Sequence, residues 1–302
     1  MTKTQSHAFA ARAVPAGPGG GALPVVALHS SASTGGQWRG LTALFAGRRR
    51  VLTPDLPGYG LAAAEAGGYA GALDAGTLAG EAERVLRSIG ASAPSFHLVG
   101  HSYGGAVALK IALTYPWRVR SLTLIEPVVF HLLAQGGERD TADMRLYRGI
   151  LGVRDRLRGA AAAGWPAHGM AAFVDFWNGP GAWDGIDTGQ RQQLAGQARV
   201  VLRNFASALG ESWPLTTVAR LGMPLQTITG ERSPEVTQRL TEKLIDTASD
   251  VTAARVFAAG HMAPLTHAAS VNSLIERHIR LAEEKEVSAL RRAAFHGSPA
   301  AA

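Results

Sequence analysis

The residues Gly100-His101-Ser102-Tyr103-Gly104 form a pattern that suits nucleophilic chemistry. They follow the apolar run 95–99 and precede a helix-like stretch, 106–115. In a nucleophile elbow of the type G-x-S-x-G, a strand turns sharply into a helix and holds the serine exposed. Small residues on both sides let the backbone pass without clashes. We therefore predict that Ser102 is a nucleophile; the alternative is a glycine-rich connecting turn.

A histidine near the C-terminus is the candidate general base. A serine hydroxyl is a poor nucleophile at neutral pH unless a histidine within hydrogen-bond reach takes its proton. His261 lies in the loop-like stretch 258–264, directly after the last apolar run, where it would come beside the elbow. The pattern favours His261 as the base over a simple surface histidine.

The third member of such a site is a carboxylate that orients the histidine and stabilises its charged form. Its usual source is the loop after the strand that resumes the sheet, here 230–234, but Ser233 stands where the acid is expected and cannot supply a charge. Glu126 ends the preceding apolar run, and an acid there can reach the same histidine from the neighbouring strand. We favour Glu126 as the acid and keep Glu231 as the alternative. Glu126 could instead be a capping or ion-pairing carboxylate.

An oxyanion hole requires backbone N–H donors where negative charge develops on the substrate oxygen, and losing one donor typically costs about 10²–10³ in rate. Tyr103, directly after the candidate nucleophile, can supply one donor. The second is expected from the loop after the apolar run 23–28, with Ser31 the first candidate and Ser30 the next. The alternative for this loop is a plain polar turn.

Strand-like and helix-like segments alternate on both sides of these residues. The expected strands are 23–28, 50–53, 95–99, 119–125, a run from after Met223 to Thr229, and 251–257. The expected helices are 77–89, 106–115, 235–247 and 267 to about 281. Strands that are nearly continuous in apolar residues and alternate with helices indicate a parallel sheet covered on both faces, and hence the α/β class.

The alternation stops between the two halves of this pattern. The stretch 127–214 is tryptophan-rich and helix-biased, and we expect it to be a helical lid over the carboxyl ends of the strands. The chain then divides into a core of 1–126 and 215–282, the lid of 127–214, and a C-terminal tail of 283–302 that we expect to be partly disordered. The lid aromatics either line a substrate pocket or form the lid's own core: Trp165, Phe173, Phe176 and Trp177.

Composition limits the other possibilities. The 302-residue chain has no cysteine, which excludes disulfides, thiolate metal sites and a cysteine nucleophile. The formal charge of +7 raises the question of nucleic acid, but the basic clusters 48–50 and 154–158 carry no interleaved aromatics and are interpreted as solvated faces. No apolar run is long enough to span a bilayer, and the start lacks a secretory pattern. We expect a cytoplasmic protein with a small-molecule substrate and with neither a nucleic-acid nor a membrane partner; the sequence does not indicate its oligomeric state.

No cofactor or metal site is expected. The glycine-rich stretch 17–21 follows no strand and lacks a lysine, so a linker is the better interpretation than a phosphate-binding loop.

Together these residues resemble the α/β-hydrolase superfamily over about 23–281. The order Ser102, acid, His261 matches that of the family, and the loop 55–60 is similar to its D-x-P-G-x-G loop. The family usually has His-Gly in the first loop, where this chain has His29 and Ser30. The resemblance implies an α/β-hydrolase fold, with a mostly parallel sheet flanked by helices and a helical lid insertion. Some relatives, among them certain haloalkane dehalogenases, carry the acid after the earlier strand, as proposed for Glu126.

Serine, histidine and a carboxylate imply acyl transfer through an acyl-enzyme. Hydrolysis of a small-molecule carboxylic ester is the favoured reaction. The resemblance leaves open carbon–carbon bond hydrolysis of ring-cleavage products and peracid formation, and also a non-catalytic ligand-binding protein on the same fold. Dehalogenases and epoxide hydrolases use an aspartate nucleophile, so Ser102 argues against both activities.

Overall fold

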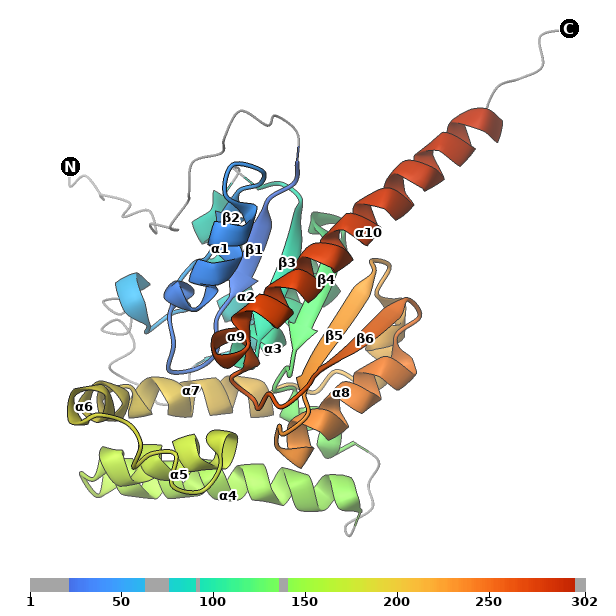
Figure 1. Ribbon diagram of the computed structural model, residues 1–302. Coiled ribbons are helices and arrows are strands. Elements are labelled where there is room, and N and C mark those ends of the chain that lie inside the picture. The colour runs from blue at the N-terminus through green and yellow to red at the C-terminus, as the bar shows by residue number, and fades with distance from the viewer. Residues whose placement is uncertain (1–21, 63–75, 91–92, 136–140, 297–302) are drawn as a thin grey trace, which may run out of the picture.

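The computed structural model describes residues 22–62, 76–90, 93–135 and 141–296, and its centre is a six-stranded parallel sheet (Figure 1). The strand order is β2-β1-β3-β4-β5-β6. The strands are β1 (Val25–Leu28), β2 (Val51–Leu52), β3 (Phe96–His101), β4 (Val119–Ile125), β5 (Leu225–Gly230) and β6 (Val251–Val256). The predicted fold class, a parallel sheet flanked by helices, is confirmed.

The central strands are buried because their sequences are almost continuously apolar. Every residue of β1 and β3 is buried, as expected where helices cover both faces of a parallel sheet, whereas the edge strand β6 is largely exposed. After β1 the chain goes to β2 on one side and returns to β3 on the other, so the strand order reverses between β1 and β3. Ligand sites in such sheets lie outside the carboxyl ends of the strands at this reversal.

Helices cover the two faces with separate apolar clusters. One face carries α1 (Arg39–Phe45) and α10 (Ala268–His296), and the other carries α2 (Leu78–Ile89), α3 (Tyr103–Thr114) and α8 (Glu235–Thr247). The spacing of apolar residues in α2 predicts its buried face, and the Thr77 side chain caps the helix by accepting a hydrogen bond from the N–H of Gly80 at 3.1 Å. Short helical turns join these elements: 3-10 helices at Gly35–Trp38, Pro116–Arg118, Phe130–Leu133 and Leu215–Arg220, and α9 at Ala263–Thr266.

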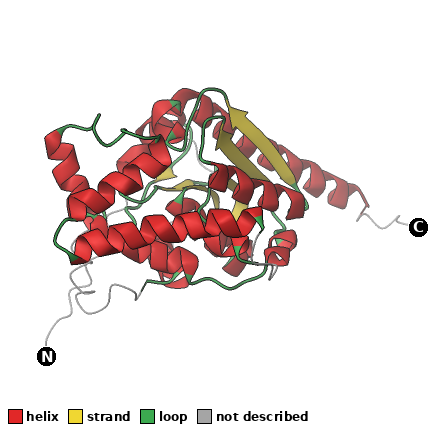
Figure 2. Ribbon diagram, turned by 90° about the horizontal axis from the view of Figure 1, so that it is seen from below, coloured by secondary structure: helices red, strands yellow, loops and turns green. Residues whose placement is uncertain are grey.

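The described part of the stretch between β4 and β5 contains four α-helices: α4 (Ala142–Ala162), α5 (Pro166–Asn178), α6 (Thr188–Gly196) and α7 (Ala198–Leu209). Thr141 and Asp187 cap α4 and α6 with their side-chain oxygens. Figure 1 places these helices below the sheet, and in Figure 2, seen from below, they lie in front of the strands. We call α4–α7 the helical insertion.

The last helix differs from the sequence prediction. Helix α10 continues to His296, so the predicted helix end near Leu281 is wrong, and the predicted tail of 283–302 begins inside this helix. The segment 282–296 is rich in Ala, Glu, Lys, Leu and Arg, which are good helix formers, and Arg280 pairs with Glu284 one turn later. The last residues of the predicted tail, 297–302, lie outside the described residues.

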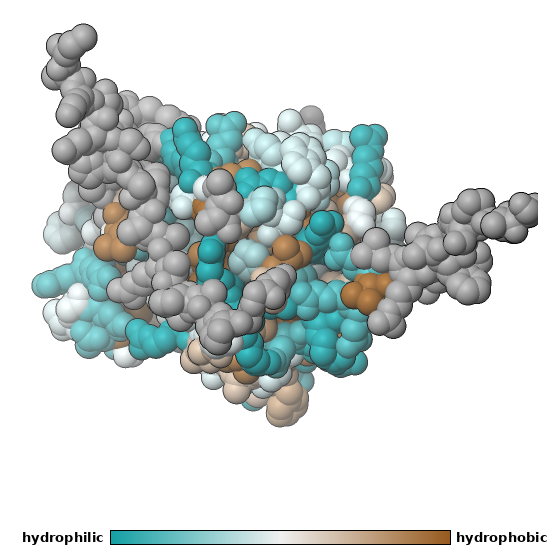
Figure 3. Space-filling view, turned by 90° about the horizontal axis from the view of Figure 1, so that it is seen from above, coloured by the Kyte–Doolittle hydropathy of each residue, from teal (hydrophilic) through white to brown (hydrophobic). Residues whose placement is uncertain are grey.

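The face seen in Figure 3 shows hydrophilic side chains with scattered, small hydrophobic areas. In the described part of the chain, no helix combines the length and the apolar character needed to cross a membrane.

Candidate active site

Ser102 lies on the sharp turn between β3 and α3. Its backbone has φ 54° and ψ −117°, a left-handed conformation that is costly for a residue other than glycine. The neighbouring glycines are required by close packing: a Cβ on Gly104 would lie 2.4 Å from the carbonyl oxygen of His29, and one on Gly100 would lie 2.4 Å from that of Gly104. The elbow predicted from the sequence is therefore present as a strained strand-to-helix turn.

Ser102, His261 and Glu126 lie in one chain of hydrogen bonds. His261 Nδ1 lies 2.6 Å from Glu126 Oε2, and His261 Nε2 lies 3.0 Å from Ser102 Oγ. A carboxylate only accepts, so the proton sits on Nδ1 and leaves Nε2 free to accept from the serine hydroxyl. All three side chains are almost completely buried, with exposed fractions of 5%, 3% and 0% for Ser102, His261 and Glu126.

Glu126 is held as a carboxylate. Burial alone would raise its pKa, but the hydrogen bond and charge of His261, together with donation from the Gly230 N–H (2.8 Å) and the Ser233 hydroxyl, outweigh it and lower the pKa to about 2. Glu126 also has a positive φ of 45°, which turns the chain at the end of β4. Ser233, at the position where the acid is usual, thus donates to the acid of the neighbouring strand. The sequence signal for this role of Ser233 was a serine at the position where the acid is usually found.

Glu231, the alternative acid, lies elsewhere. It is exposed, and its carboxylate accepts from the N–H of Ala258 at 2.9 Å, on the loop that leads to His261. The structure therefore brings Glu126, and not Glu231, against the histidine.

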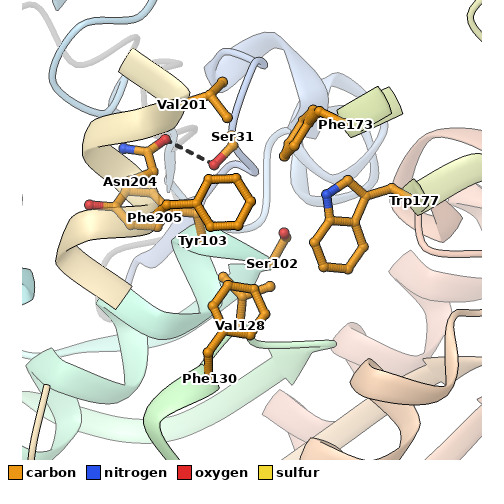
Figure 4. A pocket seen from close by; sticks show the side chains of 10 residues that line it. All are labelled: Ser31, Ser102, Tyr103, Val128, Phe130, Phe173, Trp177, Val201, Asn204 and Phe205. Carbon is orange, nitrogen blue, oxygen red and sulfur yellow. Dashed lines mark hydrogen bonds between the residues drawn. The ribbon is translucent and has the colours of Figure 1, made fainter. Parts of the chain in front are cut away.

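The two oxyanion candidates lie beside Ser102. Tyr103 begins α3, where backbone N–H groups have no partner within the helix, and Ser31 lines the same cavity (Figure 4). The N–H and hydroxyl of Ser30 both donate to Gln37 Oε1, at 3.2 and 3.1 Å, so this alternative donor is already occupied. The geometry favours the pair Ser31 and Tyr103.

Asn204, in the helical insertion, supports the loop that carries Ser31. Asn204 Oδ1, from α7, accepts hydrogen bonds from the Ser31 hydroxyl at 2.9 Å and from the Tyr59 hydroxyl at 2.5 Å. Figure 4 shows the bond between Asn204 and Ser31 above the cavity. The contact joins residues 173 positions apart, and no local sequence signal could have revealed it.

Two buried neutral histidines fix the backbone around the site. His29 donates from Nδ1 to the Ser30 carbonyl and accepts from the Leu56 N–H at Nε2, both at 2.8 Å, and burial lowers its pKa to about 4. His101 donates from Nε2 to the His261 carbonyl at 2.8 Å; burial, aided by the nearby His261, lowers its pKa to about 3. The loop 55–60 is likewise structural, since Asp55 accepts from the N–H groups of Gly35 and Leu61.

Aromatic residues of the insertion divide between the site and the surface. Trp177 is stacked on His261, with ring centroids 4.4 Å apart and planes inclined by 25°, and Phe173 lies beside Trp177 on the same wall of the cavity (Figure 4). Phe176 lines a separate hollow on the far side of Trp177. Trp165 is 63% exposed and does not line the cavity beside Ser102, so the prediction that it lines the pocket or the lid's core is wrong.

In the part of the chain that the structure describes, no three His, Asp or Glu side chains are grouped so that they could hold a metal ion.

Comparisons with known proteins agree with this fold. A family model described as the Alpha/beta hydrolase family matches residues 25–274. The chain is 38% identical over 108 residues to the dihydrolipoyllysine-residue acetyltransferase component of the acetoin cleaving system of Pseudomonas putida. The aligned segment covers 35% of this chain and 27% of that protein. It is also 35% identical over 106 residues to the pimeloyl-(acyl-carrier protein) methyl ester esterase of Aeromonas hydrophila. This aligned segment covers 33% of this chain and 36% of that protein.

A solved structure extends the likeness to the whole fold. It is the 2-hydroxy-6-oxo-6-phenylhexa-2,4-dienoate hydrolase from Rhodococcus sp. strain RHA1, with a TM-score of 0.60 and 18% identity over 85% of this chain and 91% of that one. The chain thus spans only about a third of the length of the curated relatives but nearly all of the structural one. Because the family model covers most of the chain, the protein belongs to the alpha/beta hydrolase family.

Proposed function

We propose that the protein hydrolyses small-molecule carboxylic esters through an acyl-enzyme on Ser102. The observation that carries this proposal is the chain of hydrogen bonds from Glu126 through His261 to the Ser102 hydroxyl, at 2.6 and 3.0 Å. A serine, a histidine and an ionised acid in this geometry are the parts needed for acyl transfer.

The first half of the reaction forms the acyl-enzyme. His261 Nε2 takes the hydroxyl proton as Ser102 Oγ attacks the carbonyl carbon, and the carbonyl oxygen becomes an oxyanion near the N–H groups of Ser31 and Tyr103. When the tetrahedral intermediate collapses, the ester C–O bond breaks, and the imidazolium gives its proton to the departing alcohol oxygen. The second half repeats these steps with water, which yields the acid and the free serine.

The surroundings of His261 suit the positive charge that it carries between these steps. Glu126 remains ionised and lies against Nδ1, while the indole face of Trp177 packs against the imidazole ring. A carboxylate and an aromatic face both stabilise a neighbouring cation, and their strength rises where water is excluded.

The likeness to a methyl ester esterase supports ester hydrolysis, and an equal likeness, 34% identity over 118 residues, to a 2-hydroxy-6-oxo-2,4-heptadienoate hydrolase keeps carbon–carbon bond hydrolysis as the second candidate. We further propose that the helical insertion acts as a lid, because Phe173, Trp177 and Asn204 belong to it and line the cavity beside Ser102. The division into a core and a lid, the cytoplasmic location and a small-molecule substrate without nucleic-acid or membrane partners remain predictions from the sequence.

The test is turnover of a panel of p-nitrophenyl esters by the wild type and by Ser102→Ala, with labelling by a fluorophosphonate probe. We expect the wild type to hydrolyse the esters and to be labelled, and Ser102→Ala to lose both. Ser249→Ala, at an exposed serine remote from the site, serves as the matched control and should retain both. Labelling without ester turnover would overturn ester hydrolysis in favour of carbon–carbon hydrolysis or peracid formation. Absence of labelling would contradict the assignment of Ser102.

A further inference from the structure

Two cavities of very different size meet at the Ser102 hydroxyl. The inner cavity, of about 20 Å³, is lined by the apolar side chains of Val128, Phe130, Val201 and Phe205. The outer cleft, of about 450 Å³, extends past His261 toward α6. Ser31, Ser102, Phe173 and Trp177 line both. A substrate whose carbonyl reacts with Ser102 must therefore place one half in each space.

The position of His261 decides which half goes where. The imidazolium must give its proton to the departing oxygen, so the departing group has to lie on the His261 side. His261 lines the outer cleft, whereas the oxyanion donor Tyr103 lines the inner cavity. The alcohol portion of an ester thus occupies the outer cleft, and the acyl chain points into the inner cavity.

The inner cavity accepts only a short acyl chain. One water-sized sphere occupies roughly 10–15 Å³ on this measure, so about 20 Å³ leaves room for one or two carbons beyond the carbonyl. The walls are interlocked: Phe130 and Phe205 stack with centroids 6.0 Å apart, and Phe173 meets Phe205 edge-on at 6.0 Å. Buried aromatic walls packed in this way do not yield without repacking their neighbours.

The outer cleft has a different chemistry. It mixes apolar side chains with the amides of Asn178, Gln190, Gln193 and Gln197, and none of the described residues that line it is Asp, Glu, Lys or Arg. Gln197 Oε1 is buried without a hydrogen-bond partner in the described part of the chain. Amides can satisfy neutral polar groups, whereas a charged group in this cleft would find no ionic partner among these residues.

We propose that the physiological substrates are acetyl- or propionyl-type esters of a larger, uncharged, polar alcohol, with the acyl chain in the inner cavity and the alcohol in the outer cleft. This inference rests on the proposed ester hydrolysis. The structural reason is the meeting of a small, aromatic-lined cavity and an amide-lined cleft at one serine, with the proton donor on the cleft side only.

The acyl half is tested with p-nitrophenyl acetate, butyrate and octanoate, which share one leaving group. We expect kcat/KM of the wild type to fall at least tenfold from acetate to octanoate. Val201→Ala and Phe205→Ala enlarge the inner cavity and should move the preference toward butyrate at least tenfold. Gln193→Ala, which changes only the cleft, should leave the acyl preference unaltered. Two cavity variants are used because both side chains are buried, and truncating the smaller Val201 costs less stability than truncating Phe205.

The alcohol half is tested with acetylcholine and its uncharged isostere 3,3-dimethylbutyl acetate. We expect kcat/KM at least tenfold higher for the neutral ester. A second pair, glycerol monoacetate and butyl acetate, compares polar with apolar alcohols, and Gln193→Leu should erase the preference for the polar one.

The outcomes separate this inference from the function that it rests on. Efficient hydrolysis of octanoate by the wild type, or of acetylcholine as fast as its isostere, would overturn the inference and leave ester hydrolysis intact. Absence of turnover for every ester would overturn both.

Discussion

The carboxyl edge of the sheet and the helical insertion contribute to the site in different ways. Ser102, Glu126 and His261 follow β3, β4 and β6, and hydrogen bonds with one another and with neighbouring backbone groups hold them. The insertion contributes mainly aromatic walls, and its hydrogen bond to the oxyanion loop comes from Asn204. We infer that the sheet edge sets the reaction, whereas the insertion, together with Val128 and Phe130, shapes the space that a substrate would occupy.

The sharpest test of the sheet edge compares its two glutamates. We expect Glu126→Gln to lower kcat by about 10³- to 10⁴-fold, because an amide can neither keep the Nδ1 proton in place nor stabilise the imidazolium. Glu231→Gln, which changes an exposed side chain bonded to the Ala258 N–H, should change kcat less than threefold. The measurement is steady-state turnover of p-nitrophenyl acetate.

An equal loss in the two variants, or a larger one in Glu231→Gln, would show that the acid comes from the loop after β5. Circular dichroism of both variants shows that the fold is retained.

The sheet edge could be predicted because its signals are local. The apolar run of β3 and the glycines around Ser102 lie within one short segment, and a serine at position 233 directed attention to Glu126. The walls could not be predicted, because Trp165 and Trp177 lie close together in the sequence and only tertiary packing decides which one faces the serine. The end of α10 was missed because its last turns carry helix formers without an apolar face to mark them.

Trp177 and Trp165 offer the matching test of the insertion. We expect Trp177→Ala to lower kcat about tenfold, since the imidazolium of His261 loses an aromatic face that is worth roughly 0.5–2 kcal/mol to a cation and gains contact with water. Trp177→Phe should recover most of this loss. Trp165→Ala removes a side chain that is 63% exposed and should stay within twofold of the wild type.

Burst and steady-state kinetics with p-nitrophenyl acetate measure these effects. If Trp165→Ala is as damaging as Trp177→Ala, the insertion acts through its overall packing and not through the ring beside His261.

The smallest effect concerns stability in acid, which two buried neutral histidines report. His101 lies under the elbow, and His131 lies in the 3-10 helix Phe130–Leu133 that precedes the insertion, in edge-on contact with Trp213 at 4.3 Å. Burial lowers their pKa values from 6.5 to about 3 and about 4. Below pH 6.5 the unfolded chain binds protons that the folded chain excludes, so the free energy of unfolding falls as pH falls toward these values.

The slope of this loss has an upper limit of about 1.4 kcal/mol per pH unit for each histidine. We therefore expect His101→Gln and His131→Gln each to flatten the fall in unfolding free energy between pH 6 and 5, whatever they do to stability at pH 7. Urea unfolding at pH 7, 6 and 5, followed by tryptophan fluorescence and circular dichroism, measures the slope. If only His131→Gln flattens it, the insertion opens before the sheet edge takes up protons, and the two regions unfold separately in acid. If both flatten it equally, the hydrogen bond of Asn204 and the packing around Ser102 join them in one cooperative unit.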